Sequence, residues 1–484
     1  MICDTEKRMY VVHLASEFAP IAKVGGLGDV VAALSKTLIQ MGVRVEVILP
    51  FYDQIDRKVL GDLHVEKKTF SFKEKKWTIY RALYSDIPLL LFESPFFERG
   101  AIYGEKDDLD RFTSFTEVAM DYLLEKTKRL DILHLHDWLT AFAAPLYFEK
   151  YQQQNLQIDG IVLTVHNMKY QGVFSPEKHS MPIDKLKKKM EDPKNPKKLN
   201  LLQGGLTCAN FLTTVSPTYA KEMQGKEGFG LEETVIKRKE NLVGILNGID
   251  TTYWNPETDS YLAKNYDATS DVQTAKQENR KALYQKLGMK EGKGPLFTCI
   301  SRLVEQKGPE LIAYGIDYIL EKGGHFVLLG STPQPGLETL FASIAKKYEN
   351  HPHAHFHFTF DEPLAHLTYG AADAILIPSI FEPCGLTQMI ALRYGTIPIV
   401  HQVGGLNDTV FDIDDPSIPE KEKNGYTFNA PTKEKLKEAI DRAFDHYENH
   451  PKKWSLMQQS GFAKDWSLDL AAKKYLQVYK NLSH

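Results

Sequence analysis

The chain has 484 residues, which is too many for one hydrophobic core and predicts at least two domains. Its 43% hydrophobic and 25% charged residues are typical of an ordinary globular protein. Because 59 basic residues stand against 63 acidic ones, for a net charge of −4, we expect neither a nucleic-acid nor a membrane partner. The four cysteines, Cys3, Cys208, Cys299 and Cys384, are far apart, which argues against structural zinc and against a disulfide framework.

The segment before Met9 is charged and lacks the apolar region of a secretion signal. No apolar run in the sequence reaches the length of a transmembrane helix. The expected compartment is therefore the cytoplasm. An organellar protein whose transit peptide had been removed would have the same sequence features.

The first elements predict a βαβ unit with a glycine-rich turn. An apolar strand at 10–15 is followed by the turn at 23–29, an amphipathic helix at 30–41 and a second strand at 44–50. The turn is not a dinucleotide-binding G-x-G-x-x-G, because Val31 stands where the third glycine would fall. Two interpretations remain open. Either the amides of Gly25 and Gly26 bind phosphate or sugar oxygens, with Lys23 and Asp29 as charged partners, or this is a tight turn with incidental charges.

Polar side chains follow the next two strands of this half of the chain. The strand at 131–136 ends at Asp137 and Trp138, and the strand at 161–165 ends at His166 and Asn167. A carboxylate beside an indole ring suits sugar hydroxyls and an apolar sugar face. A metal site of His134, His136 and Asp137 is the alternative, but a strand places the two histidines on one face and the aspartate on the other.

The remaining segments predict a second α/β series. Residues 63–92 suggest short antiparallel strands, and the Lys- and Pro-rich stretch 178–198 suggests a surface excursion. A turn-rich, polar stretch at 247–271 is typical of a domain boundary. Beyond it the expected strands are 295–300, 325–330, 354–360, 374–378 and 397–400, and the expected helices are 309–320, 433–447 and 470–482. The fold class is therefore α/β, with two doubly wound domains.

Two loops of the second series carry the strongest chemical signal. Arg302 and Lys307 follow a strand and precede a helix, which suits a diphosphate. The stretch 381–388 also follows an apolar strand, and it places Glu382 beside the flexible backbone of Gly385. Open α/β sheets bind ligands at the carboxyl ends of their strands, so we expect a partly anionic, partly hydroxylated ligand here.

Eight motifs, in order along the chain, resemble those of bacterial glycogen synthases and plant starch synthases. They lie at 23–29, 136–138, 164–167, 214–220, 247–250, 301–308, 378–388 and 404–410. The resemblance covers the chain from about Met9 to Tyr479. It implies a GT-B fold, in which two Rossmann-like domains face each other across a cleft. The implied divisions are an N-terminal acceptor-side domain at 1–253, a C-terminal donor domain at 254–461 and a helix at 462–484 that crosses back to the first domain.

The resemblance implies a retaining glucosyltransferase. Such enzymes move glucose from ADP-glucose to the non-reducing end of an α-1,4-glucan such as glycogen, starch or a maltooligosaccharide, and they need neither a catalytic metal nor another cofactor. The implied catalytic residues are Lys23, Asp29, His166, Arg302, Lys307 and Glu382. The implied substrate-binding residues are Gly25, Gly26, Asp137, Trp138, Asn167, Asn247, Phe360, Cys384, Gly385, Leu386 and Thr387.

The resemblance also assigns individual roles. Arg302 and Lys307 neutralise the leaving diphosphate, with Lys23 reaching in from the other domain, and Glu382 contacts the glucose hydroxyls. His166 positions the sugar near its O6, and Phe360 stands where the family often has a tyrosine that stacks on adenine. The leaving diphosphate accepts the proton of the acceptor. The chain departs from the family pattern at Gln203, where many relatives have lysine, and at Ile390, where an aromatic residue is common.

Three other functions compete with this expectation. The chain could prefer UDP-glucose, or it could be a glucan-binding or chain-initiating protein of the same fold with little turnover. The glycine-rich turn alone would also suit a nicotinamide oxidoreductase. The sequence leaves the oligomeric state open.

Overall fold

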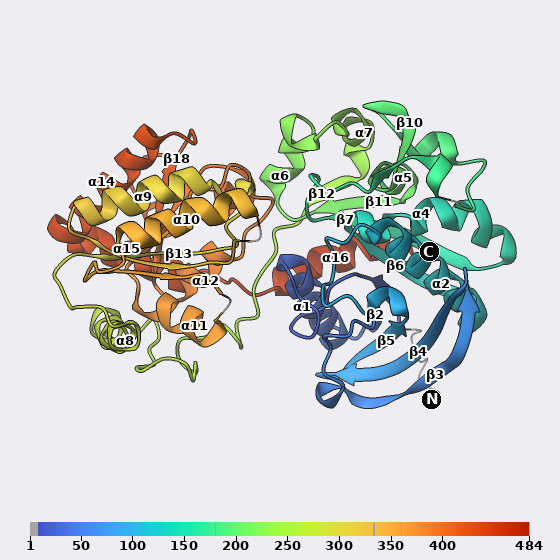
Figure 1. Ribbon diagram of the computed structural model, residues 1–484, viewed down its shortest axis with the longest axis horizontal. Coiled ribbons are helices and arrows are strands. Elements are labelled where there is room, and N and C mark those ends of the chain that lie inside the picture. Colours follow the sequence, from blue (N-terminus) through green and yellow to red (C-terminus); the bar gives the residue numbers. More distant parts are fainter. Residues whose placement is uncertain (1–7, 180, 333, 360, 484) are drawn as a thin grey trace, which may run out of the picture. The chain divides into compact units, whose positions relative to one another are not determined.

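The structure, a computed structural model, describes residues 8–179, 181–332, 334–359 and 361–483 (Figure 1). The chain forms two compact units. Unit 1 comprises Met1–Asn247 and Leu468–His484, and unit 2 comprises Gly248–Ser467. These divisions fall close to the expected ones after residues 253 and 461, and the last helix belongs to unit 1.

Unit 1 is built on one nine-stranded sheet in the order β12-β11-β7-β6-β1-β2-β5-β4-β3. The strands are β1 (Tyr10–Leu14), β2 (Arg44–Pro50), β3 (Gly61–Phe72), β4 (Lys75–Tyr84), β5 (Ile87–Glu93), β6 (Arg129–His136), β7 (Gln157–Val165), β11 (Phe211–Thr214) and β12 (Leu242–Gly244). The strands from β12 to β5 pair in parallel, whereas β4 and β3 continue the sheet antiparallel. The parallel strands are buried and mostly apolar, as is usual for strands covered on both faces, but they also carry buried polar residues such as His13, His134 and Thr164.

The helices of unit 1 are α1 (Gly26–Gln40), α2 (Asp108–Lys126), α3 (Asp137–Ala141), α4 (Ala143–Leu146), α5 (Leu201–Cys208), α6 (Pro217–Glu222), α7 (Glu232–Lys237) and α16 (Asp469–Leu482). The C-terminal helix α16 packs on α1 and on strands β6 and β7. A Cβ at Gly160 of β7 would lie 2.7 Å from the Leu482 side chain, so this glycine lets the helix approach the sheet closely.

Unit 2 contains a six-stranded, fully parallel sheet in the order β15-β14-β13-β16-β17-β18. Its strands are β13 (Leu296–Ile300), β14 (His325–Leu329), β15 (Ala354–His357), β16 (Ala374–Ile377), β17 (Ile397–His401) and β18 (Tyr426–Phe428). Numbered within the unit, this order is 3-2-1-4-5-6, the Rossmann arrangement. It confirms the expected doubly wound fold, and the strand order reverses between β13 and β16.

Helices cover both faces of the unit 2 sheet (Figure 1). They are α8 (Val272–Leu287), α9 (Pro309–Glu321), α10 (Pro335–Lys347), α11 (Glu362–Ala371), α12 (Thr387–Arg393), α13 (Gly404–Thr409), α14 (Lys433–Asn449) and α15 (Pro451–Ala463). Alternate strand residues enter two separate cores. Phe326 and Leu328 pack with α9, α10 and α14, whereas Val327 and Leu329 pack with α8 and α11.

Three features differ from the sequence-based expectation. Strands β3 and β4 are long rather than short, at 12 and 10 residues. The 178–198 stretch contributes to a small antiparallel sheet of β8 (Val173–Phe174), β10 (Asn195–Asn200) and β9 (Glu191–Asp192) instead of being a plain excursion. Several further elements were not expected, among them helices α2, α8, α10, α11 and α15 and strands β12 and β18. Over the part of the chain that the structure describes, no helix combines the length and apolarity needed to cross a bilayer.

Candidate active site

In unit 1 the expected residues follow the carboxyl ends of neighbouring parallel strands. The order of the sheet reverses between β1 and β6, which places the loops after these two strands at a topological switch point. The glycine-rich turn comes after β1, and Asp137 comes directly after β6. His166 and Asn167 come directly after β7, the next strand in the sheet. The sheet thus brings together residues that lie far apart in sequence.

A buried carboxylate organises the glycine-rich turn. Glu17 Oε2 accepts the amide hydrogens of Val24 at 2.6 Å and Gly25 at 2.8 Å, and its Oε1 accepts the hydroxyl of Tyr103 at 2.9 Å. The Gly25 amide, expected to bind a phosphate or sugar oxygen, is therefore donated to Glu17 in this structure. Neither Glu17 nor Tyr103 was predicted, since nothing in the sequence marks a lone glutamate after a strand. Gly26 begins α1 and is exposed.

Lys23 and Asp29, the expected charged partners of the turn, form an ion pair at 2.8 Å. Both side chains retain solvent contact, with exposed fractions of 39% and 31%. A pair this exposed contributes little to folding stability.

Asp137 has a backbone conformation that is uncommon for residues other than glycine. Its φ is +56°, in the left-handed region, at the point where β6 ends and α3 begins. One carboxylate oxygen accepts the amide hydrogens of His166 at 2.6 Å and Asn167 at 3.2 Å, which joins the tips of β6 and β7. Burial raises the pKa of Asp137 to about 7, against the lowering effect of these two bonds. Strain and a perturbed carboxyl group at a strand tip are typical of a functional site.

His166 lies at the end of a line of buried imidazoles. Its Nε2 is 3.1 Å from Nδ1 of His136, and burial lowers the pKa of His166 to about 3. The ring is therefore neutral at physiological pH, and Nδ1 is the ring nitrogen that remains for a ligand.

Three further predicted residues of unit 1 have contacts that bear on their roles. Trp138 lies against Gly172, where an added Cβ would meet the indole at 2.3 Å. Asn167 Oδ1 accepts the amide hydrogen of Lys169 at 3.0 Å. Asn247 is 7% exposed, and its Oδ1 has no hydrogen-bond partner among the described residues. A buried acceptor without a partner is costly, so Asn247 is well suited to a ligand hydroxyl.

In unit 2 the switch point brings the three predicted charged residues to two adjacent loops. Arg302 and Lys307 follow β13, and Glu382 follows β16. Lys307 Nζ donates to Glu382 Oε2 at 2.5 Å, and the same oxygen accepts the hydroxyl of Ser379 at 2.8 Å. Arg302 is exposed, and its guanidinium pairs with no carboxylate of the described residues.

Glu382 is 5% exposed, which is rare for a carboxylate and requires a partner such as Lys307. Ser379, which was not predicted, stands three residues before Glu382, a spacing that could have indicated a local hydrogen bond. The site of unit 2 is thus an oriented carboxylate paired with Lys307, and Arg302 stands in the same loop as that lysine.

The loop after Glu382 is fixed by hydrogen bonds to its backbone. Gly385 has a φ of +76°, which favours glycine, and the side-chain Nε2 of Gln388 donates to the carbonyls of Cys384 at 3.1 Å and Gly385 at 2.9 Å. The amide hydrogen of Gly405 is donated to the Glu382 carbonyl at 3.0 Å. Leu386 and Thr387, which open α12, are half-buried.

The remaining expectations have mixed outcomes. Phe360 lies outside the described residues. Gln203 donates to the Thr207 hydroxyl at 3.4 Å, and Ile390 is buried in α12. The histidines that lie together are His13, His134 and His136, with ligand atoms within 4.8 Å of one another, rather than the set with Asp137 weighed from sequence. Both ring nitrogens of His134 already bond to hydroxyls, of Tyr479 at 2.7 Å and of Thr164 at 2.6 Å.

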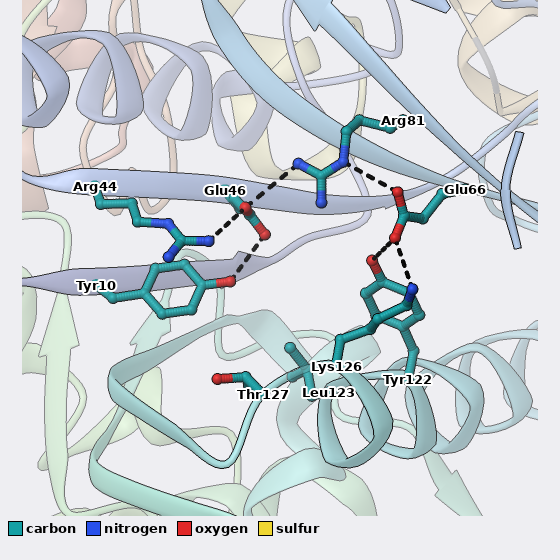
Figure 2. A pocket seen from close by; sticks show the side chains of 9 residues that line it. All are labelled: Tyr10, Arg44, Glu46, Glu66, Arg81, Tyr122, Leu123, Lys126 and Thr127. Atoms are coloured by element: carbon teal, nitrogen blue, oxygen red, sulfur yellow. Dashed lines mark hydrogen bonds and ion pairs between the residues drawn. The ribbon is translucent and has the colours of Figure 1, made fainter. Parts of the chain in front are cut away.

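A cavity of about 200 Å³ lies elsewhere in unit 1 (Figure 2). Two of the residues that line it, Tyr10 and Arg44, begin β1 and β2. The cavity therefore lies at the amino ends of these strands, whereas the predicted residues follow the carboxyl ends. Its charges satisfy one another. Glu46 accepts from Tyr10, Arg44 and Arg81, and Glu66 accepts from Arg81, Tyr122 and Lys126. A ligand here would have to break this network, so the cavity is not the candidate site.

Comparisons with known proteins match both halves of the chain. The family described as "Starch synthase catalytic domain" matches residues 10–237, and "Glycosyl transferases group 1" matches residues 280–456. The chain is 41% identical to a glycogen synthase of Protochlamydia amoebophila, over 98% of this chain and 99% of that protein. It is 43% identical to the probable starch synthase 4 of Arabidopsis thaliana, over 98% of this chain but 47% of that protein, so it spans about half of that relative.

Solved structures agree with these matches. The catalytic domain of starch synthase IV from Arabidopsis thaliana, bound to ADP and acarbose, matches 99% of this chain with a TM-score of 0.93 and 42% identity. A sucrose-phosphate synthase from Thermosynechococcus elongatus matches 98% of the chain with a TM-score of 0.63 and 16% identity, a likeness of fold alone.

Proposed function

The chain belongs to the glycogen and starch synthase family of GT-B glycosyltransferases, and on this premise we propose that it transfers glucose from ADP-glucose to the non-reducing end of an α-1,4-glucan. The transfer retains the anomeric configuration of the donor. The acceptor is glycogen, starch or a maltooligosaccharide.

One observation carries the proposal. The chain matches, over nearly its whole length, a starch synthase catalytic domain whose structure contains ADP and acarbose. The charged groups of unit 2 suit such ligands, because Arg302 and Lys307 can bind a diphosphate while Glu382 accepts hydrogen bonds from sugar hydroxyls.

The proposed step breaks the bond between glucose C1 and the diphosphate oxygen and forms a bond between C1 and the acceptor O4 on the same face. The proton of the acceptor hydroxyl passes to the leaving diphosphate. Arg302 and Lys307 stabilise the negative charge that develops on that group. Because positive side chains supply this stabilisation, the proposed reaction uses no metal ion or other cofactor.

The contacts of unit 1 support roles toward the glucose. Nδ1 of His166 and Oδ1 of Asn247 are available to sugar hydroxyls, whereas Asp137 holds the backbone from which His166 projects. Asp29, with Lys23, lies on the glycine-rich turn. Glu17 orders this turn through two of its amides, so it acts by positioning rather than by contact with the reacting atoms.

The test is glucose incorporation into glycogen from radiolabelled ADP-glucose and UDP-glucose, compared side by side in buffer that contains EDTA. We expect incorporation from both donors to be measurable and that from ADP-glucose to be faster. No incorporation from either donor, with glycogen binding retained, would instead favour a glucan-binding protein. Incorporation that EDTA abolishes would refute the metal-free step.

A further inference from the structure

A hydrogen-bonded line of three imidazoles crosses the centre of the unit 1 sheet. His13, His136 and His166 come from β1, β6 and the tip of β7, three strands that are adjacent in the sheet. His13 Nδ1 lies 3.1 Å from His136 Nε2, and His136 Nδ1 lies 3.1 Å from His166 Nε2. The first two rings are fully buried, whereas His166 is partly exposed at the strand tip.

All three rings are neutral at physiological pH. Burial lowers the pKa of His13 and of His166 to about 3, and it lowers the pKa of His136 well below its ordinary value. The other histidine of the cluster, His134, is also neutral for the same reason, and it bonds to two hydroxyls outside the line. Asp137 faces His166 only through the backbone amide, at 2.6 Å.

Neutral imidazoles in a line constrain one another. Each ring has one N–H and one lone pair, so every nitrogen-to-nitrogen bond needs the N–H of one ring and the lone pair of the next. Only two arrangements satisfy both bonds. In one, every Nδ1 carries the proton; in the other, every Nε2 carries it.

The buried end of the line selects between these arrangements. His13 Nε2 has no hydrogen-bond partner among the described residues. If the Nε2 atoms carried the protons, a buried N–H would have no acceptor, which is rarer and more costly than a buried acceptor without a donor. The arrangement with the protons on Nδ1 is therefore favoured, and it makes Nδ1 of His166 a hydrogen-bond donor.

We propose that His13 and His136 are positioning residues that hold His166 as the Nδ1–H tautomer, so that this ring donates a hydrogen bond to a hydroxyl oxygen of the donor sugar. The inference rests on the proposed function for the identity of the ligand. The tautomer itself follows from the three rings and needs no turnover to be observed. His13 acts from two rings away and touches neither the ligand nor His166.

The direct test is the ¹⁵N spectrum of the full chain with labelled histidines, in which the shifts of Nδ1 and Nε2 report the tautomer of each ring. The signals of His166 are identified by their loss in His166→Asn. We expect wild-type His166 to carry its proton on Nδ1. A proton on Nε2 would overturn the proposal whatever the activity of the protein, so its failure is distinguishable from a failure of the proposed function.

Variants of His13 test the coupling. His13→Phe removes the first bond and should leave His166 as a mixture of tautomers, with kcat lowered about 10-fold and KM for the glucan unchanged. His13→Asn, whose amide can replace the Nδ1–H donor, should restore both the tautomer and most of kcat. The matched control is His134→Phe, which removes an equally buried ring outside the line and should leave the His166 tautomer unchanged.

Two results would contradict the coupling. The first is a His13→Phe variant whose His166 tautomer and kcat equal those of the wild type. The second is a stoichiometric metal ion in the purified wild-type protein that is lost in His13→Phe, because the ring nitrogens would then be ligands rather than partners of one another.

Discussion

At the scale of single residues, Lys307 and Glu382 form an ion pair whose two charges have fixed positions. The carboxylate is nearly buried, and one of its oxygens accepts from both the ammonium and the Ser379 hydroxyl. Removing two charges from water costs about as much as their attraction returns, so such a pair contributes little net stability. Its arrangement is better explained by a ligand that both groups bind.

Variants of this pair should separate stability from activity. Lys307→Met leaves the Glu382 charge buried without its cation and should lower the free energy of unfolding by about 3 kcal/mol. Lys307→Met combined with Glu382→Gln should recover most of that stability but none of the activity. Urea unfolding and transfer rates on the same samples check this. A double variant that regains activity along with stability would mean that the pair is only structural.

Arg302 is predicted to act on the leaving group alone. Arg302→Ala should lower kcat/KM roughly 100-fold, because it removes about 3 kcal/mol of transition-state stabilisation. This magnitude is that of the loss of one hydrogen-bond donor to an oxyanion. Because the side chain is exposed, the melting temperature should stay the same. Lys286→Ala, which removes an exposed cation from α8 of the same unit, is the control and should keep full activity. An Arg302→Ala enzyme with unchanged kcat/KM would refute the assigned role.

The sequence predicted the charged residues of the site better than the residues that hold them. Arg302, Lys307 and Glu382 each follow an apolar run, so their place at strand ends was readable. Glu17 and Ser379 act through bonds within folded loops, whose conformation no short pattern marked, and His13 acts through a contact that forms only when strands are aligned side by side. His13, for example, lies directly opposite His134 on the neighbouring strand, a register that no local pattern specifies.

At the scale of elements, apolar runs predicted most of the parallel strands of both units. Elements with few apolar residues were not predicted. Helix α8 is mostly polar, and few of its residues enter the core, although its Asp271 cap was a readable signal because the carboxylate accepts the Thr274 amide hydrogen. Strand β18 has three residues, which are too few to show the alternation of apolar and polar residues that marks a strand. The order of the strands in a sheet depends on long-range pairing, which the sequence of a single strand does not specify. The doubly wound arrangement was instead predicted from the alternation of strands and helices along the chain.

Helix α8 carries a buried lysine whose titration should be visible in the stability of the protein. Lys276 Nζ donates to the carbonyls of Tyr369 at 3.1 Å and Tyr394 at 2.9 Å and to the Thr396 hydroxyl at 2.9 Å. Burial lowers the pKa of Lys276 to about 7. Between that pH and the ordinary lysine pKa of about 10.4, the unfolded chain binds more protons than the folded one, so Lys276 makes stability rise with pH.

Lys276→Met should remove this pH dependence. Relative to the variant, the wild type should gain roughly 3 kcal/mol of unfolding free energy from pH 7 to pH 9.5. Denaturant unfolding of both proteins at the two pH values measures the difference. Lys281→Met, an exposed position on the same helix, is the control and should show no such gain. Parallel pH profiles for the wild type and Lys276→Met would contradict the assignment.

Helix α13 approaches the loop after Glu382 so closely that only glycine fits. A Cβ at Gly405 would lie 2.1 Å from the carbonyl oxygen of Cys384, and the contacted atoms are backbone that cannot rotate away. Gly405→Ala should therefore displace the loop at 384–387, raise KM for the donor and cost about 2 kcal/mol of stability. Gly336→Ala, where no atom lies within 4 Å, is the control. Unchanged donor KM in Gly405→Ala would show that the loop does not bind the donor.

At the scale of the whole molecule, unit 2 is formed by one continuous segment of the chain and unit 1 by two. Unit 2 is a single segment with its own core, whereas unit 1 needs α16 from the far end of the chain. Tyr479 of α16 bonds to buried His134, and Leu482 packs on Gly160. The packing of unit 1 therefore depends on residues that follow unit 2 in the sequence.

Removal of α16 should therefore destabilise unit 1 and leave unit 2 folded. A fragment of residues 248–467 should fold alone and unfold cooperatively on heating, because its sheet is covered on both faces by its own helices. A fragment that ends at residue 467 should lose the cooperative transition of unit 1 and keep that of unit 2. Calorimetry of the two fragments and the full chain decides the matter. Two intact transitions in the fragment that lacks α16 would contradict the dependence.

The most direct measurement follows a single glucose through the reaction. ADP-glucose labelled with ¹³C at C1 is incubated with the wild-type chain and a maltooligosaccharide, and the product is examined by NMR. We predict that the label appears in an α-linked glucose on O4 of the non-reducing end, with one ADP released for each glucose transferred. A β-linked product, or label released only as free glucose, would contradict retaining transfer to a glucan.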